Sequence, residues 1–218
     1  KLCLEDFSIG RLKTQSDFWK NGWKIRLFNF MKYLAPFGLV LFVFGLYLAF
    51  FQHSDIWYSV FLIGGFLFLE GINYPNGFSV LKNRKWFLKT WLIFISITVV
   101  FEVIGNLYLN LWDYPTFNRL DYLIHAIIIG YAFTGFFGLE FFCFIQRIFI
   151  SKKAQIIILP VSAVLFGYLN EYPNIFAYEW KYINWPFGEF LGIPILISFL
   201  WIILLFVLFF KKPFEFRK

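Results

Sequence analysis

Residues 99–115 read VVFEVIGNLYLNLWDYP and place one carboxylate and two amides inside an apolar run. Glu102, Asn106 and Asn110 recur every four residues, so we expect them on one face of a helix. The run is too long and too apolar for a surface helix, which predicts that this face points into the interior of a membrane protein. Ionisable side chains inside a membrane are costly and usually functional.

The composition also indicates a membrane protein. The chain has 218 residues, of which 60% are hydrophobic and 15% charged, and its mean hydropathy is +0.68. Soluble domains have about 45–50% apolar and about 25% charged residues. The net charge of +7 could suggest a nucleic-acid partner, but the basic residues cluster beside apolar runs, as topology signals do. We therefore expect a polytopic membrane protein that binds no nucleic acid.

Apolar runs of roughly 20 residues, the length that a ~30 Å hydrocarbon core requires, occur six times. They are residues 33–51, 56–72, 88–111, 121–147, 154–171 and 189–210. The predicted fold is all-α: a transmembrane helical bundle over residues 33–210, between an amphipathic arm (1–32) and a basic tail (211–218). Residues 16–32 suit either a helix lying on the membrane surface or a lead-in to the first span.

Basic residues predict the orientation of this bundle. They concentrate in the N-terminal arm, in the connections after the second and fourth spans, and in the tail, whereas the other connections hold few. Because positively charged connections stay in the cytoplasm, we expect both termini there. The predicted location is a membrane crossed several times, the inner membrane if the organism is bacterial.

The opening stretch has a counterpart near the end of the chain. Matching residues recur at nearly constant separations, namely Glu70 and Glu140 (70 positions), Glu102 and Glu171 (69) and Trp112 and Trp180 (68). We interpret this as a duplicated two-helix unit, with spans two and three matched by spans four and five. Such repeats commonly frame a central site. We expect Glu102 and Glu171 to face one cavity near the outer surface, under an aromatic loop over 172–187.

Two buried glutamates suit proton-initiated chemistry. A carboxyl group in an apolar interior keeps its proton more readily, because the charged form loses solvation. Such an acid can protonate an alkene, and aromatic faces stabilise the resulting cation by about 0.5–2 kcal/mol each. We assign Glu102 and Glu171 as catalytic acid or base. The predicted substrate-binding residues are Asn106, Asn110, Trp112, Tyr114, Glu140, Asn170, Trp180 and Tyr182.

No cofactor or metal is predicted. The cysteines, Cys3 and Cys143, have no redox or metal-ligand spacing, and the histidines, His53 and His125, provide too few ligands for a metal site. The sequence contains no phosphate-binding loop, nucleophile elbow or dinucleotide fingerprint. A role for either histidine in acyl transfer stays open.

Three stretches together resemble integral membrane lycopene cyclases and the related carotenoid hydratases: FEVIGNLYLNLWDYP, GLEFF at 138–142 and WKYINWPFGEFLGIPILISFLW at 180–201. The resemblance lies in the order of a glutamate in one span, a Trp-x-Tyr element after it, and a Gly-x-Pro run opening the next helix. The matching positions are Glu102, Trp112 and Tyr114, Trp180 and Tyr182, and Gly192 and Pro194. The Pro-x-Glu-Glu-x-x-Phe-Phe element of the cyclases is represented only by Glu140, Phe141 and Phe142. The resemblance implies cyclisation or hydration of a polyisoprenoid.

Two other classes of function fit the same residues. A proton- or cation-coupled transporter would use the four glutamates in the spans as a relay along a water-filled passage. A non-catalytic subunit, alone or assembled with other chains, would use them as hydrogen-bonding groups that hold helices together. An isoprenoid enzyme would instead have a cavity open to lipid.

Overall fold

Long helices make up nearly all of the computed structural model, which describes residues 15–149 and 151–210. The principal helices are α1 (Gln15–Phe50), α2 (Trp57–Asn73), α3 (Arg84–Phe101), α5 (Tyr131–Ile148), α6 (Lys152–Glu171) and α8 (Ile195–Phe210). The shorter ones are the 3₁₀ turn η1 (Tyr74–Asn76), α4 (Arg119–Asp121) and α7 (Asn174–Ala177). Two π-helical segments extend the principal helices: η2 (Glu102–Tyr108) continues α3, and η3 (Tyr122–Gly130) joins α4 to α5.

Each of the predicted apolar runs contains a long helix, which confirms the all-α prediction, although the last run is helical only from Ile195 and the third only as far as Tyr108. Helical segments long and apolar enough to cross a membrane occupy Tyr33–Phe50, Arg84–Tyr108, Arg119–Ile148 and Lys153–Ala177. These segments indicate a multi-pass membrane protein. The helix of the first predicted span is longer than expected, because α1 begins at Gln15 and runs through the predicted boundary at residue 33. Residues 1–14 and the predicted tail, 211–218, lie outside the described residues.

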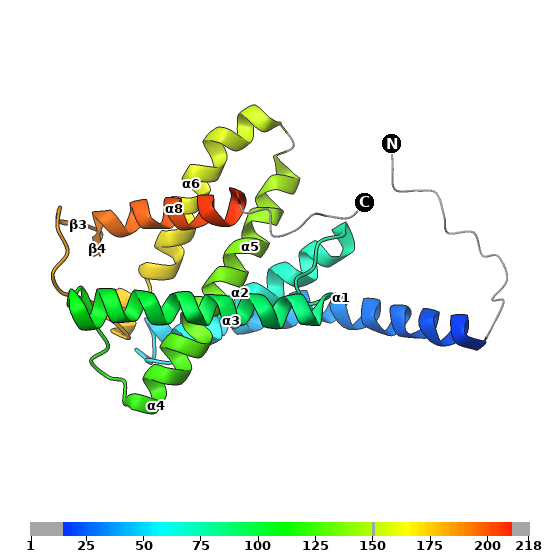
Figure 1. Ribbon diagram of the computed structural model, residues 1–218, viewed down its shortest axis with the longest axis horizontal. Helices are drawn as coiled ribbons and strands as arrows, with labels where there is room; N and C mark the ends of the chain where they lie inside the picture. The colour runs from blue at the N-terminus through cyan, green and yellow to red at the C-terminus, as the bar shows by residue number, and fades with distance from the viewer. Residues whose placement is uncertain (1–14, 150, 211–218) are drawn as a thin grey trace.

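The helices α1 and α2 form a tight antiparallel pair. Glycines bring their backbones together: a Cβ atom on Gly45 would lie 2.7 Å from the Cα of Phe61, and one on Gly64 would lie 2.7 Å from the backbone carbon of Leu41. Small residues permit this approach between apolar helices. Figure 1 shows this pair running in the same general direction as α3 and α8, with α5 and α6 inclined across them.

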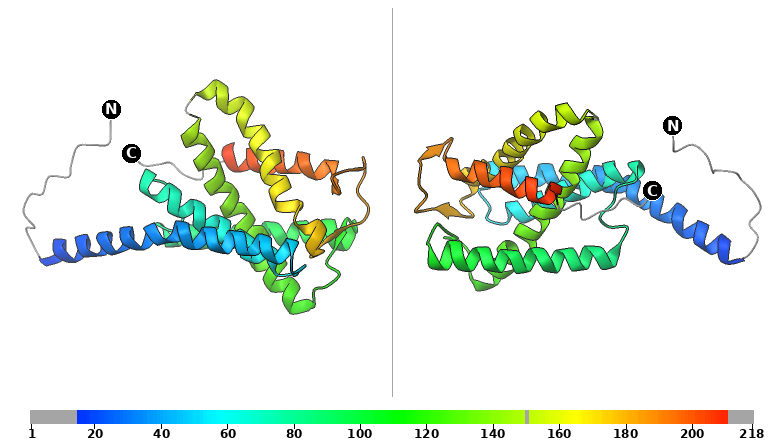
Figure 2. Two further views of the ribbon diagram at one scale, coloured as in Figure 1. Left: turned by 180° about the vertical axis from the view of Figure 1, so that it is seen from behind. Right: turned by 45° about the horizontal axis from the view of Figure 1, so that its top comes forward.

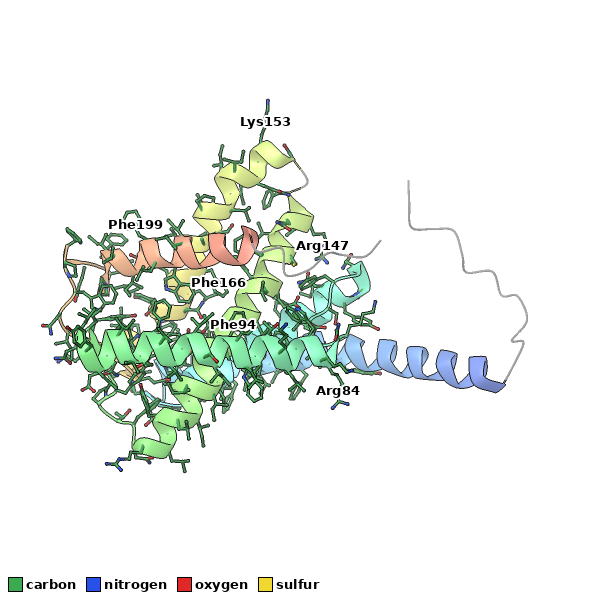
Figure 3. All side chains as sticks on the ribbon, viewed as in Figure 1. Arg84, Phe94, Arg147, Lys153, Phe166 and Phe199 are labelled. Atoms are coloured by element: carbon green, nitrogen blue, oxygen red, sulfur yellow. The ribbon has the colours of Figure 1, made fainter. Side chains whose placement is uncertain are left out.

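The core lies where α5 crosses α2, α3 and α6. Phe66 and Phe136 are buried with ring centroids 5.6 Å apart. Phe94 of α3 and Phe166 of α6, both labelled in Figure 3, complete this core. The ring of Phe94 lies 5.3 Å from that of Phe136, and the ring of Phe166 lies 4.8 Å from that of Phe137. Helix α5 is therefore the element around which the others pack.

Two short antiparallel strand pairs lie in the connections at one end of the bundle (Figures 1 and 2). Strand β1 (Trp112–Asp113) pairs with β2 (Lys181–Tyr182), and β3 (Glu189–Phe190) pairs with β4 (Ile193–Pro194). The second pair is closed by a two-residue turn in which Leu191 and Gly192 both have positive φ, 52° and 74°. Such turns match the twist of a hairpin. The β1–β2 pair is the more important, because it joins the two predicted site regions.

Candidate functional site

Glu102 is buried among hydrogen-bond donors from three parts of the chain. Its Oε2 accepts a hydrogen bond from the Tyr122 hydroxyl at 2.7 Å and one from the Asn106 amide at 3.3 Å. Its Oε1 accepts from the Tyr114 hydroxyl at 2.9 Å. The indole Nε1 of Trp112 lies 3.2 Å from both oxygens. Although Glu102 is only 2% exposed, both oxygens therefore have partners.

The two π-helical segments begin at this cluster. Glu102 is the first residue of η2, and Tyr122 is the first residue of η3. π-Helical turns are rare and are frequently found at functional sites. Within η2, Gly105 lies against the Trp112 indole so closely that a Cβ atom would be 2.5 Å from its Cζ3. The glycine therefore lets the indole reach Glu102.

The prediction that Asn110 shares a helix face with Glu102 is wrong. The helix ends at Tyr108, and Asn110 adopts a left-handed conformation with φ of 50°. Its carbonyl oxygen instead accepts a hydrogen bond from the Asn184 side chain at 3.0 Å. The chain must turn here to enter β1, which removes Asn110 from the face that Glu102 and Asn106 share.

Glu171, the last residue of α6, has a similar environment. Its Oε2 accepts from the Tyr182 hydroxyl at 2.7 Å and from the Trp180 indole at 3.3 Å. Its Oε1 accepts from the indole of Trp201, on α8, at 3.1 Å. Glu171 is 8% exposed. Each glutamate is thus bound by the tryptophan and the tyrosine of the Trp-x-Tyr element that follows it.

The β1–β2 pair brings these two elements together. Trp112 is the register partner of Tyr182, and Asp113 is the partner of Lys181. Continuing the register by one residue sets Tyr114 opposite Trp180. The pairing is extended by a hydrogen bond from the Ile183 amide to the Leu111 carbonyl at 2.9 Å. The likeness of the two stretches in sequence therefore has a spatial counterpart, in which their Trp-x-Tyr elements face each other.

Asn170 belongs to a polar contact beside Glu171. Its Oδ1 accepts a hydrogen bond from the Tyr58 hydroxyl at 3.2 Å, and its Nδ2 donates to the Phe166 carbonyl at 2.7 Å. The same hydroxyl lies 2.9 Å from the Thr134 Oγ1. The ring of Tyr58 packs on Trp180 at 4.9 Å. Tyr58 therefore ties α2 to α5, to α6 and to the aromatic loop.

Glu179 adds a further buried carboxyl group in the loop after α7. It is 1% exposed, and its Oε2 accepts a hydrogen bond from the Tyr58 amide at 3.4 Å. Burial raises the pKa of Glu179 well above its usual value, and the nearby charge of Asp55 raises it further. The sequence places Glu179 among loop charges and contains no sign of this burial.

Glu140 lies apart from the outer clusters, and its assignment as a substrate-binding residue stays a prediction. Its Oε2 accepts a hydrogen bond from Asn73 at 2.6 Å, and Glu70 lies within electrostatic range. Tyr131, at the other end of α5, lies within electrostatic range of Glu102. The nine residues from Tyr131 to Glu140 span about 14 Å of helix. The length of α5 therefore separates Glu140 from the candidate site.

Tyr122 and Trp201 are site residues that sequence reasoning missed. Trp201 lies beside Glu171 and follows it by 30 positions, much as Tyr131 lies near Glu102 and follows it by 29. Extending the repeat into the last helix would have pointed to Trp201. Tyr122 has no such signal, because its position depends on how the loop from Pro115 to Asn118 folds back.

The histidines lie apart in different contacts. Nδ1 of His125 is 2.8 Å from the Ser59 Oγ, and Nδ1 of His53 is 2.8 Å from the Phe176 carbonyl oxygen. Among the described residues, no three histidine, cysteine or acidic side chains are placed to hold a metal ion. A shallow open hollow lies on α3 around Leu92 and Ser96, and it does not include the buried glutamates. A cavity shared by the two glutamates remains a prediction.

The site can hold negative charge without a basic partner. In the described part of the chain, the polar contacts of Glu102 and Glu171 are with indole, phenol and amide donors, and none is with lysine or arginine. Indole groups can only donate a hydrogen bond, whereas a tyrosine hydroxyl can rotate and accept one from a protonated carboxyl group. The arrangement can therefore stabilise a carboxylate beside a cation or hold a neutral acid.

No protein-family model, curated protein or solved structure matches this chain.

Proposed function

We propose that the protein is an integral membrane enzyme that performs proton-initiated, non-redox chemistry on a polyisoprenoid such as a carotenoid. The proposed topology has six spans with both termini in the cytoplasm, because the basic residues favour that orientation. The two glutamate clusters would then lie near the outer surface. The observation that carries the proposal is the pair of buried carboxyl groups, each held by tryptophan and tyrosine and without a basic partner among the described residues.

The reaction needs no electron transfer. One carboxyl group gives its proton to an alkene carbon, and the π electrons of that double bond form the new C–H bond, leaving a carbocation on the neighbouring carbon. In cyclisation, a second double bond attacks this carbon, and a carboxylate removes a proton from the product cation. In hydration, water attacks and the carboxylate removes a proton from the oxygen. Glu102 and Glu171 supply the acid and the base.

The aromatic surroundings suit a carbocation. Trp57 stacks near Trp180 with ring centroids 5.9 Å apart, and Trp112 stacks near Trp185 at 6.3 Å. Tryptophan faces are the strongest of the aromatic cation stabilisers. Flexible apolar chains also enter such surroundings at little desolvation cost. A polyene substrate therefore matches both the polarity and the charge of the site.

The packing of the core favours an enzyme over a transporter that passes protons or cations along the glutamates. Between the outer clusters and the Glu70–Glu140 contact, α2 and α5 contribute Phe61, Phe66 and Phe136, each at most 1% exposed. The polar side chains of this stretch, Ser59 and Thr134, are hydrogen-bonded to His125 and Tyr58 on the side of the outer clusters, and the rings separate them from Glu70 and Glu140. A transporter would need a hydrated path there.

A non-catalytic subunit is the second candidate. A structural role predicts that the carboxylate of Glu102 makes all of its hydrogen bonds, and four side chains do donate to it. These bonds connect η2, the β1 region and η3. The two candidates differ in what replacing the carboxyl group does, because a structural role survives an isosteric amide and a proton-transfer role does not.

Glu102→Gln separates them. Gln can still accept from Trp112 and Tyr114 through its oxygen, while its amide donates to a reversed Tyr122 hydroxyl. The variant should therefore fold, and we expect product formation to fall by at least about 100-fold, because general acid–base groups contribute roughly 10²–10⁴-fold. The exposed Glu189→Gln is the matched control.

The assay expresses each variant in cells that make an acyclic carotenoid and analyses the extracted pigment by chromatography and mass spectrometry. Cyclisation leaves the substrate mass unchanged, and hydration adds one water. A wild-type product that persists in Glu102→Gln would refute the proposed role. Absence of any product from well-folded wild-type protein would favour the subunit.

A further inference from the structure

A second carboxyl pair lies farther along α2 and α5, near the end of α2 and in the middle of α5, away from the candidate site. Glu70 and Glu140 are each 0% exposed. They come from helices that pack directly on each other, Asn73 on the helix of Glu70 donates to Glu140, and the two carboxyl groups lie within electrostatic range of each other. Neither belongs to the outer clusters, so the proposed function does not use them.

The pair is surrounded by donors. The Ser79 hydroxyl donates to Oε1 of Glu70, and the Val80 amide donates to its Oε2 at 2.8 Å. The Asn73 amide donates to Oε2 of Glu140 at 2.6 Å and to its backbone carbonyl at 2.8 Å. Three of the four carboxyl oxygens therefore have conventional partners.

The fourth oxygen, Oε1 of Glu140, is buried and has no such partner among the described residues. Asn73 occupies the other oxygen of Glu140, so Oε1 is the atom left to face Glu70. Two carboxylates in contact away from water repel each other strongly, and one proton between them removes the repulsion. That proton also satisfies the remaining oxygen.

We propose that Glu70 and Glu140 form an acid pair that binds one proton between them. The proton joins α2 to α5, while Ser79 and Val80 fasten the loop after α2 onto the same pair. The end of α2, the middle of α5 and this loop are thus held together by one shared proton. This inference is independent of the proposed enzymatic function.

A proton fits the surroundings better than a metal cation. The groups aimed at the pair are the N–H groups of Asn73 and Val80 and the O–H of Ser79, whose hydrogens would repel a bound cation. Metal sites for hard cations instead present oxygen lone pairs from six or more ligands. No third acidic or histidine ligand joins the pair within the described ranges.

Among the residues that the structure describes, few other charged groups meet the pair. On α5, Cys143 lies within electrostatic range of both glutamates, and Arg147 donates to the Ile72 carbonyl at 3.1 Å (Figure 3). The loop after α2 contributes Lys82, which is exposed, and η1 contributes Tyr74. From α1, Ala35 packs on Gly71, so the described part of that contact is apolar. None of these groups replaces the shared proton.

The proposal predicts that the stability contributed by the pair is full below about pH 4 and falls as the pH rises until the shared proton has left. While the proton is bound, the pair has a single negative charge. When it leaves, two adjacent carboxylates push α2 and α5 apart. A Gln side chain at either position supplies an N–H in place of the shared proton, so Glu70→Gln and Glu140→Gln should each fold and should each abolish this loss.

Infrared spectroscopy of the purified full-length protein in detergent tests the proton directly. Wild type should show, at neutral pH, the C=O stretch of a protonated carboxyl group that shifts in D₂O, and each single variant should lack that component. Melting temperatures over a pH series should fall less steeply with rising pH in either variant than in wild type and in the Glu189→Gln control, because only the contribution of the Glu70–Glu140 pair is removed.

A spectrum unchanged by both substitutions would show that the two carboxyl groups are ionised and would overturn the proposal. Added Na⁺ or Ca²⁺ that raises the melting temperature of wild type, but not of the variants, would assign the pair to a metal cation and would equally overturn it. If one variant fails to fold, the other and the wild-type pH titration of the band still decide the outcome.

Discussion

Gly105→Ala should displace Trp112 from Glu102, because the glycine and the indole are in direct contact. The added Cβ would lie 2.5 Å from Cζ3 and 2.7 Å from Cζ2, with Cη2 nearer still. Carbon atoms pack at about 3.5–4.0 Å. The indole must therefore withdraw by well over ~1 Å, which breaks hydrogen bonds that are already 3.2 Å long.

The expected loss of stability follows from two costs. Overpacking a well-packed site costs about 1–3 kcal/mol, and a lost buried hydrogen bond adds about 1 kcal/mol. The free energy of unfolding should fall by roughly 2–4 kcal/mol. Denaturation of the purified protein in mixed detergent micelles, followed by tryptophan fluorescence, measures this change.

A double-mutant cycle isolates the contact. In a Trp112→Ala background, the added methyl group meets no ring, and alanine is a better helix former than glycine by about 1 kcal/mol. Gly105→Ala should then be neutral or stabilising, so the sign of its effect reverses. Equal destabilisation in both backgrounds would refute the reasoning, because it would show that the methyl group clashes with something other than the indole. Ser96→Ala, on exposed α3, is the control for an alanine on the same helix.

Two further predictions concern the second cluster and the loop above it. Gly167→Ala should displace Trp201 from Glu171, because its Cβ would lie 2.5 Å from Cγ of that indole; we expect a loss of about 1–3 kcal/mol in the same detergent assay, and an unchanged stability would contradict the contact. The raised pKa of Glu179 means that the folded protein binds this proton more tightly than the unfolded chain, so stability is full below about pH 4 and falls as the pH rises towards the raised pKa. Glu179→Gln should remove this fall and raise the melting temperature at neutral pH, whereas a parallel pH profile in variant and wild type would exclude Glu179 as its source.

The two candidate functions treat the same hydrogen bonds differently. In an enzyme, the donors around Glu102 position a group that must exchange a proton. In a subunit, they satisfy a buried acceptor and hold the ends of helices. The glycines beside Trp112 and Trp201 matter in both cases, because they determine whether each indole reaches its glutamate. Combining the glycine variants with Glu102→Gln therefore separates packing from proton transfer.

Local sequence determined the helices and the pairing of each glutamate with its own Trp-x-Tyr element. Apolar runs of membrane-crossing length form helices because hydropathy and backbone hydrogen bonding act within each segment. The spacing from Glu102 to Trp112 and from Glu171 to Trp180 is short, so each element can fold back onto its own helix end. These features could be predicted without knowing how the helices pack.

Tertiary structure alone decided which distant groups complete the clusters. Tyr122 reaches Glu102 through a loop, Trp201 reaches Glu171 from the last helix, and Asn110 is diverted by the turn into β1. Glu140 pairs with Glu70 because α2 and α5 pack together along their length. Contacts between separate segments depend on crossing angles and registers that side-chain spacing within one helix does not specify. Spacing therefore identified the glutamates and their partners nearby in the chain, and packing chose the partners that lie far from them in sequence.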